Sequence, residues 1–402
     1  MKEDITAAAI LNVLGRCIAG EDANTLWNGY SSKERQEMLK FAAVCNCRKL
    51  LYYCLGGQIF GECAREAKIE FIVNAANAES RENIAIELER FFKDNNIDFR
   101  FVKGMSLCRS VYPERAIRYS VDIDVLVKQE DAVRVFELLK ARGAKPDHEY
   151  LDRSKQHLPR LSYKKNFIEL HTYLFDGEEG ENKFLWQEFE RRRDNVELIL
   201  LHVLHHSIIR HFFLNGISAI IDVGYILRQT ELDMSYFHYL EEKLKSHGLL
   251  DMVICSFPEF FAGYRELSEN DVPQEVCRAM RNIVFKQNIS NIGKREIETV
   301  CFHQKKTFDK ISHIISRLKL MTPSYFAYKY RTTKFSANCL FPFYFLREVV
   351  CKMRLYLREK EKLNSENSKS DIKKIDFIMT LHNYVYEHNN GREENTLNSF
   401  FK

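Results

Sequence analysis

The chain has 402 residues, 45% hydrophobic and 29% charged, so it is globular and long enough for two or three domains. Its net charge of +4 is mild and argues against a dedicated nucleic-acid binder. Only 7 prolines and 16 glycines favour long helices over an all-β fold, and no run of about 18 apolar residues predicts a membrane span.

The amino-terminal sequence lacks the pattern of a cleavable signal peptide. The 11 cysteines are scattered along the chain without a Cys-x-x-Cys pair, which is typical of a reduced protein. We therefore expect a cytoplasmic location.

Residues 1–79 have the apolar periodicity of helices. The pattern predicts helices at Thr6–Ala19, Ser32–Ala43 and Arg48–Ala67. We expect these residues to form a helical cap on the region that follows.

Helix and strand patterns then alternate. We predict a helix over Ser80–Asn95, a strand over Ile97–Val102 and a helix over Met105–Tyr112. Gly104 lies between the last two and permits a close approach of the backbone to a ligand, as phosphate-binding loops require. The N–H groups that begin the following helix would then face the phosphates.

Two carboxylates share one face of the next predicted strand, Val121–Val127. Asp122 and Asp124 point to the same side, because side chains alternate along a strand, and the opposite side is apolar. Like charges on a mostly buried strand repel, and a divalent cation with hard oxygen ligands, Mg²⁺ or Mn²⁺, resolves the conflict. The alternative is a solvated edge strand with an acidic face.

A helix over Glu130–Arg142, ended by Gly143, separates this strand from another over Asn166–Leu174. On the latter, Glu169 and His171 share one face with Tyr173. They form either a third acidic position with a neighbouring histidine or a polar strand face at the rim of the sheet.

The segment Lys103-Gly-Met-Ser-Leu107, then Arg118, then Asp122-Ile-Asp-Val-Leu-Val127 resembles the nucleotidyltransferase superfamily that shares the DNA polymerase β catalytic fold. Within that superfamily the chain is most similar to a bacterial branch labelled "uncharacterised nucleotidyltransferase". The resemblance covers about residues 85–175, with a weaker similarity to about residue 230.

The resemblance implies that Gly104 and Ser106 hold the nucleoside triphosphate and that Asp122 and Asp124 bind metal. In the branch, an acidic residue followed two positions later by histidine is common on the neighbouring strand. Glu169 is therefore the third candidate for catalysis and metal binding, where it would position or deprotonate the attacking group.

Two basic residues flank this motif. Arg118 can reach phosphate oxygens with its planar fork, and Lys103 either binds the nucleotide or turns to solvent. The spacing from Gly104 to Asp122 exceeds that of compact family members and fits the branch with an inserted Tyr-Pro segment, here Val111–Glu114.

The remaining residues, 176–402, read as helical. Residues 176–182 are predicted to be a loop, and a periodic apolar pattern over Val196–Leu227 carries His202 and His206 at a spacing that can bind zinc. No protease motif with a glutamate surrounds them, so the pattern favours core histidines over zinc ligands. Because the branch often has a histidine-rich helix followed by an aspartate, the resemblance implies that His206 and Asp222, with His171, border the acceptor pocket.

The carboxy-terminal residues, about 300–402, mix basic and aromatic side chains, notably over 313–335 and 341–354. This mixture predicts either a surface that stacks bases and binds phosphates or a helical subdomain with basic residues outside. Residues 363–374 are predicted to be a linker.

We therefore expect an α+β protein with a small mixed-sheet nucleotidyltransferase core, 80–175, between helical regions 1–79 and 176–402. The implied activity is metal-dependent transfer of a nucleoside monophosphate from an NTP, with ATP the expected donor, to a hydroxyl of a small molecule or protein. The alternatives are a tRNA-modifying transferase of toxin type and a catalytically silent nucleotide-binding scaffold.

Overall fold

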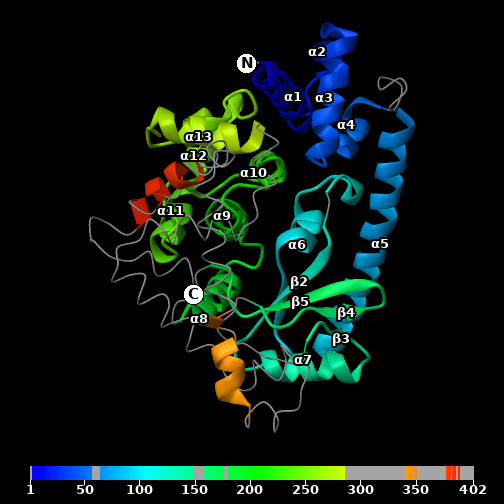
Figure 1. Cartoon of the computed structure of the whole chain (residues 1–402), viewed down its shortest axis with the longest axis vertical. Coiled ribbons are helices and arrows are strands. Elements are labelled where there is room, and N and C mark those ends of the chain that lie inside the picture. Colours follow the sequence, from blue (N-terminus) through cyan, green and yellow to red (C-terminus); the bar gives the residue numbers. More distant parts are fainter. Residues whose placement is uncertain are drawn as a thin grey trace.

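The fold was analysed in a computed structural model. It describes residues 2–56, 64–118, 120–148, 157–175 and 180–285, with shorter stretches within 340–350 and 377–389. The chain is an α+β protein in which helices surround one five-stranded mixed sheet, as Figure 1 shows. The predicted basic and aromatic run 313–335 and the predicted linker 363–374 lie outside the described residues.

The sheet is small and has the strand order β1-β2-β5-β4-β3. Strand β2 pairs in parallel with β5, and the other neighbouring pairs are antiparallel. The strand bounds are β1 Phe99–Phe101, β2 Asp122–Val127, β3 Lys145–Pro146, β4 Leu161–Tyr163 and β5 Asn166–His171. Each expected strand is present but shorter than predicted.

Two helices cover one face of the sheet and bury its apolar side. Helices α5, Ala64–Asp94, and α7, Ala132–Ala141, contribute Leu88, Phe92 and Phe136 to a core with Ile123 and Val125. Gly143 has a φ of 101° directly after α7, so glycine ends this helix as predicted. This core leaves the other face of the sheet free for polar groups.

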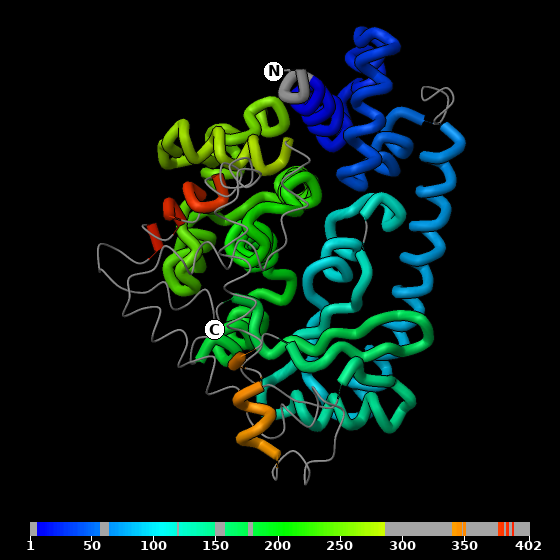
Figure 2. Tube along the Cα trace, in the orientation of Figure 1, coloured from blue at the N-terminus to red at the C-terminus, as the bar shows by residue number. Residues whose placement is uncertain are grey.

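Helix α5 begins sixteen residues earlier than the predicted start at Ser80, so that start is wrong. Its added turns pack on α4, Arg48–Leu55, and on the short turn η2, Arg115–Ile117. The predicted helix Arg48–Ala67 is in turn too long, because α4 ends at Leu55 before Gly56 with a φ of 73°. Figure 2 traces α5 from the amino-terminal helices to the sheet.

The amino-terminal region contains three further helices. They are α1 Lys2–Ala19, α2 Ala23–Gly29 and α3 Ser32–Val44. The short helix α2 was not predicted, although Asp22 caps it by accepting hydrogen bonds from two backbone N–H groups. Ser31 and Glu34 form a capping box on α3, which explains why its start was correctly placed.

The carboxy-terminal region is also helical. Its elements are α8 Glu181–Arg191, α9 Val196–His205, the π turn η3 His206–Arg210, α10 Gly216–Gln229, α11 Met234–Lys243, α12 Leu249–Ser256, η4 Ala262–Leu267 and α13 Gln274–Phe285. The periodic apolar pattern over Val196–Leu227 corresponds to α9, η3 and α10. The chain widens into η3, and Phe212 and Phe213 then adopt positive φ angles before α10 begins. Residues 181 and 182 belong to α8 and not to the predicted loop.

Amino- and carboxy-terminal helices share the larger of the two hydrophobic cores found among the described residues. Ile10 and Trp27 from the first region belong to the same cluster as Leu201 and Ile220 from the second, and Leu381 near the end of the chain joins it. No helix among the described residues is long and apolar enough to cross a membrane. The boundaries at residues 79 and 175 stay a prediction.

Candidate active site

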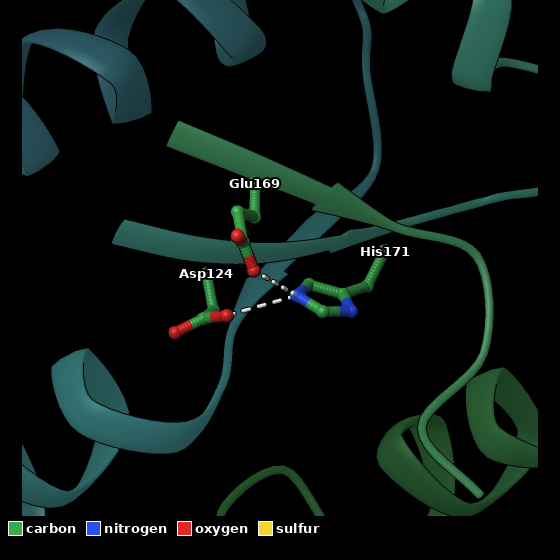
Figure 3. Close-up of side chains that lie close together, drawn as sticks. All are labelled: Asp124, Glu169 and His171. Atoms are coloured by element: carbon green, nitrogen blue, oxygen red, sulfur yellow. Dashed lines mark hydrogen bonds and ion pairs between the residues drawn. The ribbon is translucent and has the colours of Figure 1, made fainter. Parts of the chain in front are cut away.

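The face of the sheet opposite α5 and α7 carries a row of carboxylates. The parallel register pairs Asp124 with Glu169 and Leu126 with His171, so these side chains share one face with Asp122. Figure 3 shows the Asp124 and Glu169 carboxylates directed at the same ring nitrogen of His171. Strand alternation therefore brings together the residues that the sequence singled out on β2 and β5.

Asp124 is the centre of this group. Its Oδ1 atom lies 2.8 Å from His171 Nε2 and accepts a hydrogen bond from Lys103 Nζ at 2.9 Å. The same ring nitrogen lies 3.6 Å from Glu169 Oε2. One ligand atom from each of Asp124, Glu169 and His171 fits within 4.8 Å, so these three residues form a possible metal site.

Asp122 has fewer partners than its neighbours. Its Oδ1 atom is buried without a hydrogen bond among the described residues, and the closest cation, Arg160 Nη1, lies 4.0 Å away. Burial, followed by the charges of Glu169 and Asp124, raises the pKa of Asp122 to about 6. The ionised form of this carboxyl group is therefore disfavoured, because no close positive charge compensates for its burial and for its two acidic neighbours.

The other two carboxyl groups are better compensated. Burial alone would raise the pKa of Asp124, but the charge of Lys103 and the hydrogen bond from His171 hold that pKa below its usual value. Glu169 is similar, because its contact with His171 outweighs burial and lowers its pKa. Both are ionised near neutral pH.

Lys103 faces the carboxylates and not solvent. Its side chain is 18% exposed, and its ammonium group lies between Asp124 and His171 Nε2, 3.4 Å from the latter. Simple strand alternation could not predict this, because β1 ends at Phe101 and Lys103 adopts a φ of 49°. A lysine in this left-handed conformation is strained, and the contact with Asp124 holds it there.

The predicted phosphate-binding turn begins helix α6, Lys103–Ser110. Among the described residues no side chain caps its first turn, so the N–H groups there are open to an anion. Ser106 lines a cavity of about 760 Å³ beside this turn. A methyl group on Gly104 would lie 2.5 Å from Arg118 Nη1 and Ser120 Oγ, so side chains already fill the space beside this glycine.

Arg118 and Asp222 were predicted to bind phosphate and to border the acceptor pocket, respectively, and the structure pairs them with each other. Arg118 donates from Nε and Nη2 to the two oxygens of Asp222, at 2.9 Å each. Tyr112 donates its hydroxyl to the same carboxylate at 2.5 Å. Burial alone would lower the pKa of Arg118, but Asp222 raises it above its usual value. This cluster is separate from the Asp124 group.

His202 on α9 and His206 on η3 form a stacked pair of histidines. His202 and His206 stack with ring centroids 5.8 Å apart, and His206 packs edge-on against His211. Burial and nearby positive groups lower the pKa of both His202 and His206 well below the usual value, so both rings are neutral. His202 lines the 760 Å³ cavity, whereas His206 does not.

Sequence reasoning missed two features of the site. His171 was expected to border the acceptor, which stays a prediction, and it also contacts both carboxylates as a candidate metal ligand. Its place two residues after Glu169 could have indicated the second role. Arg160, the cation nearest Asp122, precedes β4 in a segment with no motif. Only the antiparallel pairing of β4 with β5 places it there.

Comparisons with known proteins give one match. The sequence profile of a family described as uncharacterised nucleotidyltransferase matches residues 31–258, which include α5, the entire sheet and helices α6 to α12. No curated protein matches the chain significantly. No solved structure does so either.

Proposed function

The chain belongs to the family of uncharacterised nucleotidyltransferases, and from this membership we propose that it transfers a nucleoside monophosphate from ATP or another NTP to an acceptor hydroxyl. The observation that carries the proposal is the cluster of Asp122, Asp124 and Glu169 on one sheet face, next to the open first turn of α6. An acidic cluster beside an anion site can bind a triphosphate only when a further cation lies between them.

The donor atoms of the cluster fit a divalent cation, Mg²⁺ or Mn²⁺. Carboxylate oxygens are the ligands that these ions prefer, and Asp122 Oδ1 is a buried acceptor without a hydrogen bond among the described residues. Asp122, Asp124 and Glu169 would hold the metal, with His171 as a further candidate ligand. When bound, the metal would neutralise triphosphate charge and increase the acidity of the acceptor hydroxyl.

The chain's own residues then account for the transfer. The acceptor oxygen forms a bond to the α-phosphorus, the bond from that phosphorus to the bridging oxygen breaks, and pyrophosphate leaves with the electron pair. Glu169 is ionised near neutral pH and would take the hydroxyl proton. Lys103 would offset negative charge on the phosphates from its position 2.9 Å from Asp124.

The remaining predicted nucleotide residues have different proposed roles. Ser106 and the N–H groups after Gly104 would bind the outer phosphates. Arg118 would act indirectly, because its guanidinium group is bound to Asp222 and packs against Gly104 at the start of α6. In this arrangement Asp222 orients Arg118, and His206 supports His202.

The size of the binding space supports the proposed acceptor class. A cavity of about 760 Å³ beside Lys103 suits a small molecule or a single protein side chain. The tRNA-modifying alternative relied on Arg347, which is described, and on four basic residues that lie outside the described residues, Arg331, Lys334, Arg354 and Arg358. A silent scaffold is disfavoured, because Glu169 points to the same histidine as Asp124 and not away from it.

The test is incubation of the full chain with each α-³²P-labelled NTP and Mg²⁺ or Mn²⁺, with and without cell lysate. We expect label on a small molecule or protein and equimolar pyrophosphate, and loss of both with Asp124→Asn. The matched control is Asp131→Asn, which alters a surface carboxylate paired with Arg134 on α7. Label on RNA would favour the tRNA alternative, and equal transfer by Asp124→Asn would refute the proposed site.

A further inference from the structure

The cavity beside Lys103 has a positive wall that the transfer reaction leaves unassigned. Five basic side chains line it against two acidic ones. Lys103 and Arg109 have carboxylate partners, at Asp124 and at Glu82 and Glu89. The other three basic residues come from separate elements, the end of α5, the middle of β1 and the loop between α8 and α9.

These three residues are Lys93, Arg100 and Arg193, and within the described part of the chain none has a carboxylate within 4.0 Å. Arg100 Nε is buried and has no hydrogen-bond partner there. The Arg100 guanidinium lies 5.8 Å from the centre of the Phe189 ring, so the aromatic ring covers one side of the guanidinium group. A buried arginine N–H group without a hydrogen-bond acceptor lowers the stability of the fold, unless a bound anion accepts its hydrogen bond.

A second unpartnered group lies in the same cavity wall. His202 is 3% exposed, and its Nε2 atom has no hydrogen-bond partner among the described residues. The wall therefore offers a neutral imidazole near Lys103 and cations farther away. Such a combination of charged and hydrogen-bonding groups is typical of a ligand pocket.

The position of Arg100 along β1 separates it from the carboxylates. In the antiparallel register Arg100 lies opposite Leu126, on the carboxylate face of the sheet but beyond Asp124. Arg100 precedes Lys103 by three residues, which corresponds to about 10 Å of extended chain. The α-phosphorus must react at the carboxylates, so a cation this far along β1 is suited to an anion carried by the other substrate.

We propose that the part of this cavity lined by Lys93, Arg100 and Arg193 is the acceptor site and that the acceptor is a small hydroxyl compound carrying a phosphate group. The phosphate would bind Arg100, Arg193 and Lys93, and His202 would accept or donate a hydrogen bond at the end nearer Lys103. A phosphomonoester carries nearly two negative charges and several acceptor oxygens, which match three cations better than a single carboxylate does. This inference rests on the proposed transfer reaction for the acceptor role alone.

The binding test does not depend on turnover. Inorganic phosphate is titrated into the full chain by calorimetry in EDTA, and again with saturating Mg²⁺ and a non-hydrolysable NTP analogue. We expect one phosphate per chain in both titrations. The double variant Arg100→Gln/Arg193→Gln should weaken phosphate binding about tenfold or more, because it removes charge-assisted hydrogen bonds.

The matched control is Arg265→Gln/Arg278→Gln, which removes the same charge from exposed positions on η4 and α13. This control should bind phosphate as the unaltered chain does, and both double variants should bind the NTP analogue equally well. Absence of phosphate binding, or equal loss in both double variants, would overturn the proposed anion site. Loss of phosphate binding when the NTP analogue is present would assign the cations to the triphosphate.

The two proposals can fail separately. If NTP transfer is absent but phosphate binds as described, the anion site stands and the acceptor role falls. If transfer occurs but phosphate does not bind, the reaction stands and the phosphorylated acceptor is excluded. A single-stranded RNA trinucleotide that binds much more tightly than phosphate, with steep salt dependence, would replace the small molecule by a nucleic acid.

Discussion

Asp124 and Asp222 are equally buried, each 6% exposed, yet their surroundings differ in charge balance. Asp222 has one arginine and one tyrosine to itself. Asp124 shares Lys103 and His171 with a face that also holds Asp122 and Glu169. Removing one partner of a matched buried pair destabilises a fold, whereas a surplus of buried acids marks a candidate functional site.

Removal of the central carboxylate should have the largest effect. Asp124→Asn takes away the oxygen that His171 and Lys103 contact and a ligand of the proposed metal. We expect transfer of labelled nucleotide to fall about a thousandfold or more, or about 4 kcal/mol, with circular dichroism unchanged. A tenfold loss or less would place the reaction elsewhere.

The Arg118–Asp222 pair should affect stability more than catalysis when it is broken. Asp222→Asn leaves the Arg118 charge buried without its partner, so we expect the free energy of unfolding to fall by about 3–5 kcal/mol in urea titrations. Asp131→Asn, at an exposed pair with Arg134, should change it by less than about 1 kcal/mol. Equal small effects would show that the Asp222 cluster is not structural.

Gly104 tests how closely that cluster supports the phosphate-binding turn. Gly104→Ala would place a methyl group 2.5 Å from Arg118 Nη1, which cannot move freely because Asp222 holds the guanidinium. We expect a loss of about 1–3 kcal/mol in unfolding free energy and weaker NTP binding. Gly263→Ala, where nothing lies within 4 Å, should leave both unchanged.

The smallest expected effect is a gain in stability. Asp122→Asn should stabilise the metal-free chain above pH 6 by about 1 kcal/mol, a value reduced by solvent screening at this half-buried group. The pKa of Asp122 is raised from 3.8 to about 6, so its ionisation destabilises the fold as pH rises through that window. The gain should vanish below about pH 4 in thermal unfolding, and destabilisation at neutral pH would contradict the charge surplus.

The sequence predicted the carboxylate face because its cause is local. Alternation along one strand places Asp122 with Asp124, and the same rule places Glu169 with His171. The parallel pairing of the two strands then unites them. Family resemblance supplied the chemistry, and the profile match over residues 31–258 confirms that membership.

Long-range pairing explains what the sequence could not predict. Arg118 and Asp222 are 104 residues apart, so no spacing rule links them. The sequence analysis therefore predicted a phosphate contact for Arg118 and a place at the acceptor pocket for Asp222, and did not predict that they pair with each other. The direction of Lys103 depends on one positive φ angle. The cavity cations come from three separate elements, α5, β1 and the loop between α8 and α9, that tertiary packing brings to one cavity.

Manganese binding tests the central claim most directly, because it reports on the surplus carboxylates without requiring the acceptor. The free Mn²⁺ signal would be followed by electron paramagnetic resonance as the full chain is added, with Asp124→Asn and Asp131→Asn in parallel. We predict that the unaltered chain and Asp131→Asn bind Mn²⁺ and that Asp124→Asn loses this binding. Equal binding by all three proteins would contradict the assignment of the β2 and β5 carboxylates as the metal site.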